Sequence, residues 1–351
     1  MAWPLATQTV RLLFLRTLET AAATAKTDRR SDEPEPSPST SFAVSNAVLT
    51  DPQRRLCAFG GREGLPRSLA SVYACFVTLF LGGGLRGAEQ RRFQLPDRRN
   101  ISSGRMAVSR DGATLFMVYC HDTLRKFHVD DGSPLYSKFI QGNCIAVARD
   151  GNVIVGSRAS ADVFTPRLIW LESFGRGTLS TPVGVCGDED VIVVAEEEEH
   201  FDDAANTMQG SCIFVFRRAD GKLLATFGHQ VLVYARAVCF MACHRRVAVA
   251  EDGARKCIAI YSIDGAFQRT VGAGVLSRPT GVACSAFDEL VVADKGLRCV
   301  VLFTADGDVA RRIGRDEPFL SVALHSATIY AYKSHPFDMR ERENAHVVVF
   351  Q

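Results

Sequence analysis

The chain has 351 residues, 47% of them hydrophobic, so it is long enough to bury a substantial core in one or two domains. Its formal net charge is only +2, and from residue 90 onward 31 Lys and Arg residues balance 31 Asp and Glu residues. This balance argues against a nucleic-acid-binding protein with a broad basic surface, so such an activity would need a local patch.

The first 42 residues have the composition of a targeting or linker segment. Residues 1–30 hold five basic residues against Glu19 and Asp28, together with a broad apolar surface of Leu and Val. This composition indicates either an organelle transit peptide or an ordinary amphipathic or frayed helix. Residues 31–42 are too rich in Pro and Ser to pack, so we expect a disordered linker there.

An uncharged run, Ser68–Leu85, lies between Arg67 and Arg86. Its length is at the lower limit for a helix that crosses a bilayer. Arginines flank it on both sides, so the positive-inside rule gives no orientation. Two interpretations stay open: a membrane anchor or late signal sequence, or a hydrophobic segment that packs on the domain or is absent from the mature protein.

A strand signature occurs three times in the second half of the chain, as Cys212–Phe216, Cys257–Tyr261 and Cys299–Phe303. Each copy is followed by an Asp-Gly turn and preceded by a Val-rich run that ends in Ala and an acidic residue. Adjacent Asp-Gly turns are 44 and 42 residues apart, which is the length of one four-stranded propeller blade. The repeat therefore predicts a β-propeller.

From about residue 90 the pattern is continuously β, with short apolar runs between Gly, Asn and Asp-Gly turns. We predict an all-β, six-bladed propeller over 90–351, preceded by a poorly ordered or helical N-terminal extension over 1–89. The predicted blades span 104–141, 142–181, 182–235, 236–278, 279–317 and 318–351.

The last predicted blade has only three strands, which would leave an open sheet edge. Propellers commonly close by borrowing a strand from the other terminus, and the candidate is Arg91–Leu95. In the second blade, Leu168–Leu171 is expected to be the third strand, after an insertion over Arg158–Arg167.

The clearest blade opens with Pro279-Thr-Gly-Val-Ala283 and continues with Leu290-Val-Val-Ala-Asp294 and then Cys299–Phe303. The third blade repeats this order with Pro182-Val-Gly-Val185 and Val193-Val-Ala-Glu196. This series of motifs resembles the NHL repeat, specifically in the blades at about 182–317. The resemblance implies a six-bladed propeller more firmly than any one function. No RING-type Cys/His cluster precedes the repeats, although such propellers often occur beside one.

Proteins that resemble this repeat include metal-dependent lactonases and amidating lyases, whose ligands are carboxylates, Asn or His around the central channel. The expected innermost strands here contain no Asp, Glu or His, and Asn143 is the one candidate ligand at the channel mouth. We therefore predict no catalytic residue, no metal site and no cofactor. An enzyme stays an alternative, as does an RNA-binding propeller, which the resemblance also allows.

The three acidic residues Glu196, Glu251 and Asp294 occupy matching repeat positions. They could form a ring of catalytic carboxylates. The resemblance instead implies that each side chain satisfies backbone groups of a turn, and we favour this structural role.

Most of the eleven cysteines fall inside apolar strand patterns, which predicts buried free thiols in a reducing compartment, the cytoplasm or an organelle matrix. Membrane anchoring through Ser68–Leu85 is the alternative location. Cys239, Cys243 and His244 could form half of a metal site, but without a second ligand pair we interpret these thiols as part of the core.

Long connections between second and third strands are expected on one face of the propeller, and function on rigid β scaffolds tends to lie on such loops. One of them is strongly acidic, and it is either solvated, a contact for a basic partner or a cation site. Its charged residues are Glu196, Glu197, Glu198, Glu199, Asp202 and Asp203.

Arginines stand next to three innermost strands on the same face, at Arg105, Arg236 and Arg278. Around one channel mouth they would form a positive ring that can receive an acidic peptide or a phosphate group. We therefore predict a non-catalytic scaffold that binds a protein partner through this face.

Overall fold

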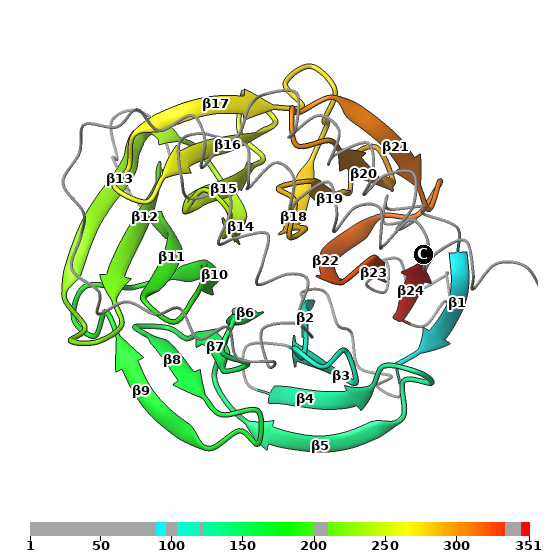
Figure 1. Ribbon diagram of the computed structural model, residues 1–351, viewed down its shortest axis with the longest axis horizontal. Coiled ribbons are helices and arrows are strands. Elements are labelled where there is room, and N and C mark those ends of the chain that lie inside the picture. Colours follow the sequence, from blue (N-terminus) through cyan, green and yellow to red (C-terminus); the bar gives the residue numbers. More distant parts are fainter. Residues whose placement is uncertain (1–88, 96–103, 120–122, 199–209, 334–344) are drawn as a thin grey trace, which may run out of the picture. The chain divides into compact units, whose positions relative to one another are not determined.

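The computed structural model describes residues 89–95, 104–119, 123–198, 210–333 and 345–351. The chain divides into two compact units, Met1–Arg55 and Leu56–Gln351, and all described residues belong to the second. Six antiparallel sheets of four strands each surround a central channel, which confirms the all-β, six-bladed propeller (Figure 1).

In each blade the innermost strand comes first. Blade one consists of β2 (Gly104–Val108), β3 (Thr114–Tyr119), β4 (Thr123–His128) and β5 (Pro134–Phe139). Blade two consists of β6 (Cys144–Val147), β7 (Val153–Gly156), β8 (Ala161–Phe164) and β9 (Trp170–Phe174). Blade three consists of β10 (Pro182–Gly187), β11 (Val191–Glu198), β12 (Gly210–Arg217) and β13 (Leu223–Leu232). Blade four consists of β14 (Ala235–Met241), β15 (Arg246–Glu251), β16 (Cys257–Ser262) and β17 (Phe267–Val271). Blade five consists of β18 (Pro279–Cys284), β19 (Leu290–Asp294), β20 (Cys299–Phe303) and β21 (Val309–Ile313). Blade six consists of β22 (Phe319–His325), β23 (Thr328–Lys333), β24 (His346–Phe350) and, from the N-terminal side of the propeller, β1 (Glu89–Gln94).

The N-terminal strand closes the ring, as the sequence predicts. β1 pairs with β24 in antiparallel register, from Glu89 opposite Phe350 to Gln94 opposite His346. Phe93 is buried in the core between blades six and one, and the Arg91 side chain donates a hydrogen bond of 3.0 Å to Asp130 of blade one. The last blade therefore presents no open edge at β24.

The middle strands of the blades are buried on both faces, because each sheet packs between two neighbouring sheets. Every residue of β7, β19 and β20 is buried, which explains their unbroken runs of Val, Ile and Leu. The outermost strands are exposed, and β21 buries only Ile313. The core clusters join adjacent blades: Val193 and Ile213 of blade three pack with Val247 and Val249 of blade four.

The Pro-x-Gly openings of blades three and five have a steric cause. A Cβ atom on Gly184 would lie 3.0 Å from the backbone N of Val238, and one on Gly281 would lie 3.1 Å from Cα of Ser321. Each glycine thus allows one innermost strand to approach the backbone of the next. Close approach of these strands keeps the central channel narrow.

Blade two differs from the sequence-based prediction. The third strand is β8, Ala161–Phe164, which lies inside the segment Arg158–Arg167 that was expected to be an insertion. Leu168 is in a turn with φ of 62°, and Trp170 begins the fourth strand, β9. The prediction of a third strand at Leu168–Leu171 is wrong because these apolar residues belong to a turn and an outer strand.

The possible transit peptide, the linker over 31–42 and the hydrophobic run Ser68–Leu85 all lie outside the described residues. Within the described ranges we find no helix with the length and apolar character needed to span a bilayer.

Candidate binding site at the channel mouth

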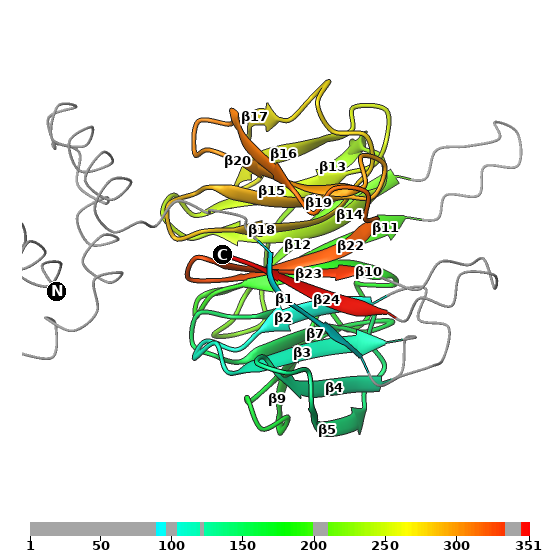
Figure 2. The ribbon, with the colours of Figure 1, turned by 90° about the vertical axis from the view of Figure 1, so that its right-hand side faces the viewer.

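The site lies on the face of the propeller where the innermost strands begin, which we call the entry face. It is marked by the first residues of these strands, Gly104, Cys144, Pro182, Ala235, Pro279 and Phe319. The opposite face, where these strands end, is called the exit face. Figure 2 shows the propeller edge-on, with its strands running between the two faces.

Arg105, in β2, crosses the channel just inside the entry face. Its Nη1 donates a hydrogen bond of 3.0 Å to the carbonyl oxygen of Leu320, and its Nη2 donates one of 3.1 Å to the carbonyl oxygen of Arg236. Leu320 belongs to the neighbouring blade six, and Arg236 belongs to blade four on the opposite side of the ring (Figure 1). The Arg105 side chain therefore bridges three blades.

Protein surrounds the Arg105 guanidinium densely, although the side chain keeps some contact with water. Burial lowers the pKa of Arg105, and the positive charge of Arg236 acts in the same direction. Arginine still stays charged at neutral pH. No carboxylate forms a salt bridge with Arg105 among the described residues, so two backbone carbonyl groups stabilise this buried charge.

The channel beside Arg105 holds a cavity of about 50 Å3, room for one or two water molecules. Backbone and small or apolar side chains line it, with Ser321 as a polar group beside Arg105. Asn143, which the sequence suggested as a ligand, precedes β6, and its backbone N–H donates a 2.8 Å hydrogen bond to Gly156.

Arg236 and Arg278 meet at one carboxylate, that of Asp252. Arg278 Nε donates a 3.1 Å hydrogen bond to Asp252 Oδ2, and Arg236 Nε lies 3.6 Å from the same oxygen. Arg236 also lies 3.8 Å from Glu197, and its guanidinium stacks 5.2 Å from the ring centre of Tyr234. Asp252 is thus shared between two arginines from different blades.

Lys295 adds a further cation beside Arg278. Its pKa is lowered by burial and by the charge of Arg278, while Asp252 opposes this shift. Within the part of the chain that the structure describes, four cations, Arg105, Arg236, Arg278 and Lys295, therefore face two carboxylates, Asp252 and Glu197, which leaves a positive excess among these residues. Since the side chain of Arg278 is 53% exposed, this excess is accessible to a ligand.

The repeat acids have structural contacts. Glu196 is buried and accepts hydrogen bonds from the backbone N–H of Ser180 and Thr181 and from the Ser180 hydroxyl. Asp294 accepts hydrogen bonds of 2.8 to 2.9 Å from the backbone N–H of Ser277, Arg278 and Leu297, which fixes the turn into β18. Glu251 differs, because it forms a 2.6 Å salt bridge with Arg255.

The structure brings together Arg105, Arg236, Arg278 and Glu197 of the residues singled out from the sequence. The three arginines nevertheless hold different strand positions: Arg105 is within β2, Arg236 lies at a register shift of β14, and Arg278 precedes β18. The Glu198 side chain and the residues Glu199, Asp202 and Asp203 lie outside what the structure describes.

Sequence reasoning missed Asp252 and Lys295, although a signal was present. Glu197, Asp252 and Lys295 each follow directly after a repeat acid, at Glu196, Glu251 and Asp294. At Glu196 and Asp294 the repeat acid binds backbone N–H groups, and the next residue, Glu197 or Lys295, lies near an arginine of the channel mouth. This position varies in charge from blade to blade.

The eight cysteines in the described part of the chain are free, and those in the strands are buried except for the partly buried Cys284. Cys243 is exposed and donates a hydrogen bond of 2.9 Å to the carbonyl oxygen of Ala286, and His244 pairs with Asp288. Across the described ranges no three His, Cys, Asp or Glu side chains gather as metal ligands would.

No protein-family model and no curated protein sequence matches the chain. Solved propellers share its fold. Regucalcin from Agrobacterium tumefaciens, a calcium-binding protein, has a TM-score of 0.56 at 10% identity, over 73% of this chain and 92% of regucalcin. A luciferin-regenerating enzyme has a TM-score of 0.55 at 13% identity, over 74% of this chain and 95% of the enzyme. The WD40 propeller of Doa1 has a TM-score of 0.53 at 15% identity, over 70% of this chain and 78% of that domain. At these identities the likeness establishes the propeller fold alone.

Proposed function

We propose that this protein is a non-catalytic binding scaffold whose entry face binds an acidic segment of a partner protein at the channel mouth. The observation that carries the proposal is that, among the described residues of the mouth, the cations Arg236, Arg278 and Lys295 outnumber the carboxylates Asp252 and Glu197. Charge-assisted hydrogen bonds from arginine to carboxylates are among the stronger polar contacts in proteins.

The size of the channel supports a surface-bound peptide as the ligand. Small-molecule sites usually have volumes of about 300–1,000 Å3. The channel cavity has about 50 Å3, and Arg105 crosses it from blade one to blade four. A peptide side chain can instead approach the exposed guanidinium of Arg278 from outside.

The resemblance to NHL repeats supports a scaffold as well, with an RNA-binding propeller as the alternative. Single-stranded RNA is usually bound through aromatic side chains on which bases stack. Among the described residues, the aromatic ring in contact with a mouth cation is that of Tyr234, and the guanidinium of Arg236 stacks on it. This arrangement favours a carboxylate-rich ligand.

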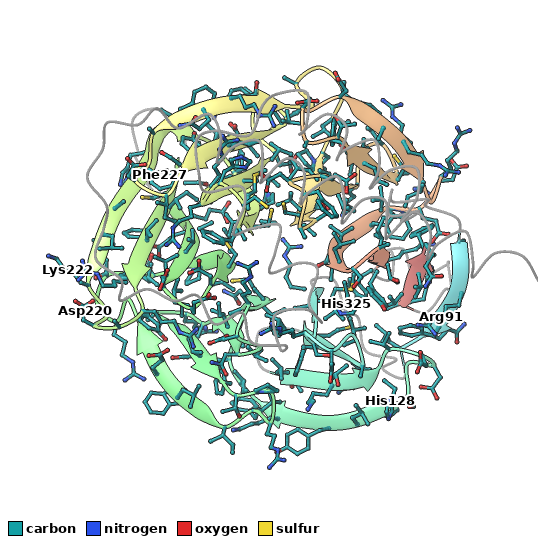
Figure 3. The ribbon with its side chains drawn as sticks, in the orientation of Figure 1. Arg91, His128, Asp220, Lys222, Phe227 and His325 are labelled. Carbon is teal, nitrogen blue, oxygen red and sulfur yellow. The ribbon has the colours of Figure 1, made fainter. Side chains whose placement is uncertain are left out.

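The test measures binding of a fluorescein-labelled oligo-glutamate peptide by anisotropy at low salt. The double variant R278Q/K295Q should weaken binding about tenfold, since two charge contacts at exposed side chains together contribute about 1.4 kcal/mol at low salt. The matched control is R217Q/K222Q, which removes the same two charges from exposed positions on blade three; Lys222 lies at the periphery (Figure 3).

Equal affinities for the two double variants would contradict the proposal. Tighter binding of a single-stranded RNA oligonucleotide than of the peptide, lost in R278Q/K295Q, would favour the RNA alternative. Melting temperatures of all variants should stay within a few degrees of the wild type, because the substituted side chains are at the surface.

A further inference from the structure

A second basic site lies on blade five, apart from the channel mouth. A cavity of about 220 Å3 opens where β20 begins and β21 ends, and it is lined by Leu297, Cys299, Arg312, Arg315 and Asp316. We call it the blade-five pocket. Leu297 belongs to the same β19–β20 connection as Lys295, so the pocket also lies on the entry face.

Two arginines of the pocket have no carboxylate partner in the described part of the chain. Among the described residues no carboxylate lies within salt-bridge distance of Arg312 or Arg315, whereas Arg218 and Arg245 each have two carboxylate partners. Both Arg312 and Arg315 are exposed. Their charges are therefore available to a ligand.

The two guanidinium groups act on one point in the pocket, the thiol of Cys299. Burial raises the pKa of Cys299 and Asp294 adds to this, while the positive charges of Arg312 and Arg315 both oppose it. Arg298 does not line the pocket, but its Nη2 donates a 2.6 Å hydrogen bond to the carbonyl oxygen of Asp316, which does. Two arginines and one acidic residue thus line the cavity, and a third arginine binds the backbone of that acidic residue.

We propose that the blade-five pocket binds the phosphate group of a phosphorylated serine or threonine on a partner peptide. Planar guanidinium groups match the oxygens of a phosphate in paired hydrogen bonds, and paired arginines are a recurring means of phosphopeptide recognition. The cavity has room for one phosphate group with several waters. None of its five lining residues is aromatic, so the pocket offers no surface for stacking a nucleic-acid base.

This proposal does not depend on the binding of an acidic segment at the channel mouth, because none of Arg236, Arg278 and Lys295 lines the blade-five pocket. The Asp316 carboxylate contributes selectivity: it repels a second negative group beside the phosphate and can accept a peptide N–H. The site therefore suits a phosphorylated residue flanked by neutral residues better than a dense polyanion.

The test uses a fluorescein-labelled pentapeptide, Ala-Gly-phosphoserine-Gly-Ala, and the same peptide with serine or glutamate at the centre. The full chain should bind the phosphopeptide at least tenfold more tightly than either relative, and inorganic phosphate should compete for it. The variant R312Q/R315Q should lose this preference. The matched control R217Q/R311Q removes two exposed arginines, one of them the neighbour of Arg312 on β21, and should keep it.

Three results would overturn the proposal. The first is equal binding of the three peptides by the wild-type chain, a result that needs no variant. The second is binding of inorganic phosphate without binding of the phosphopeptide, which would make the pocket a site for the free anion. The third is loss of phosphopeptide binding in R278Q/K295Q but not in R312Q/R315Q, which would assign the phosphate to the channel mouth.

Discussion

The two faces of the propeller use their arginines differently. On the exit face, Arg218 lies 2.6 Å from Asp150 and 2.9 Å from Glu172, and Arg245 lies 3.0 Å from Asp190 and 3.3 Å from Asp188. Each of these cations has two carboxylate partners, at least one of them in a neighbouring blade. On the entry face, Arg236 and Arg278 share Asp252, and Arg312 and Arg315 have no carboxylate partner among the described residues.

This difference separates stability from binding. Exit-face ion pairs join blade two to blade three and blade three to blade four, so these charges are already paired within the domain. Among the described entry-face residues, Arg236 and Arg278 share one carboxylate and Arg312 and Arg315 have none within salt-bridge distance, so part of their charge can contribute to binding a ligand. The comparison predicts that substitutions of the paired exit-face residues change the free energy of unfolding, whereas substitutions around the entry-face cations that share or lack a carboxylate change affinity.

The largest effect on the free energy of unfolding is expected from Asp188→Ala on the exit face. Asp188 is buried, accepts hydrogen bonds of 2.9 Å from the backbone N–H of Asp190 and Val191, and pairs with Arg245. Its loss should destabilise the fold by about 2–3 kcal/mol, because the N–H of Val191 is left buried without an acceptor. Urea unfolding measures this change. The control is Asp190→Ala. The Asp190 side chain is 65% exposed, so this substitution should lower the free energy of unfolding by less than about 1 kcal/mol. Equal losses of unfolding free energy in the two variants would refute the comparison.

The next effect is expected from Arg105→Ala, the entry-face arginine that behaves as a structural residue. Its two hydrogen bonds link blade one to blades four and six, and losing them should cost about 2 kcal/mol in urea unfolding. Water can enter the widened channel and solvate the carbonyl groups of Leu320 and Arg236, which limits the loss. A stability equal to that of the wild type would show that burying this charge costs as much as the bridge contributes.

A smaller effect, on affinity, is expected from Asp252→Asn. This substitution removes the carboxylate shared by Arg236 and Arg278 and should increase affinity for the oligo-glutamate peptide about fivefold, or about 1 kcal/mol. Anisotropy measures the change, with Asp220→Asn, at an exposed turn of blade three, as the matched control. Weaker binding in Asp252→Asn would mean that Asp252 orients the arginines for the ligand.

The smallest effect is the acid sensitivity of Glu317, an entry-face carboxylate with two partners. Burial alone would raise the pKa of Glu317, but hydrogen bonds from His346 and Arg92 outweigh it and the pKa is lowered from 4.5. A lowered pKa in the folded state stabilises the fold above about pH 4.5, and this contribution disappears as the pH falls through the folded-state pKa. The difference in unfolding free energy between the wild type and Glu317→Gln should therefore shrink between pH 6 and pH 3. A difference that grows with acid would contradict this sign.

The sequence predicted most strands because the middle strands of a propeller are buried on both faces and form unbroken apolar runs, as Val291–Val292 and Val300–Val301 do. It failed at β8, which has only four residues and contains Asp162. Its neighbour Trp170 is half-exposed on an outer strand. The apolar residues around Trp170 are exposed, so their apolar character did not indicate an inner strand. The prediction therefore placed the third strand of blade two too close to the C-terminus.

The candidate site was predictable only in part. The sequence placed Arg236 and Arg278 beside innermost strands, but it did not specify the width of the channel, which decides that Arg105 reaches Arg236 across the ring. The counter-ion Asp252 was visible as the residue after a repeat acid, although its two arginine partners come from different blades and could not be read from the sequence. The blade-five pocket joins the β19–β20 connection to the end of β21, and no spacing rule connects these segments.

The seam between β1 and β24 has a mechanical consequence. Glu89 pairs with Phe350, so the chain enters and leaves the propeller at the same end of one antiparallel ladder. A pulling force between these two ends would load the hydrogen bonds of the seam one after another, as in a zip, instead of all at once. The ring should therefore open at blade six under a force that the other five blades withstand.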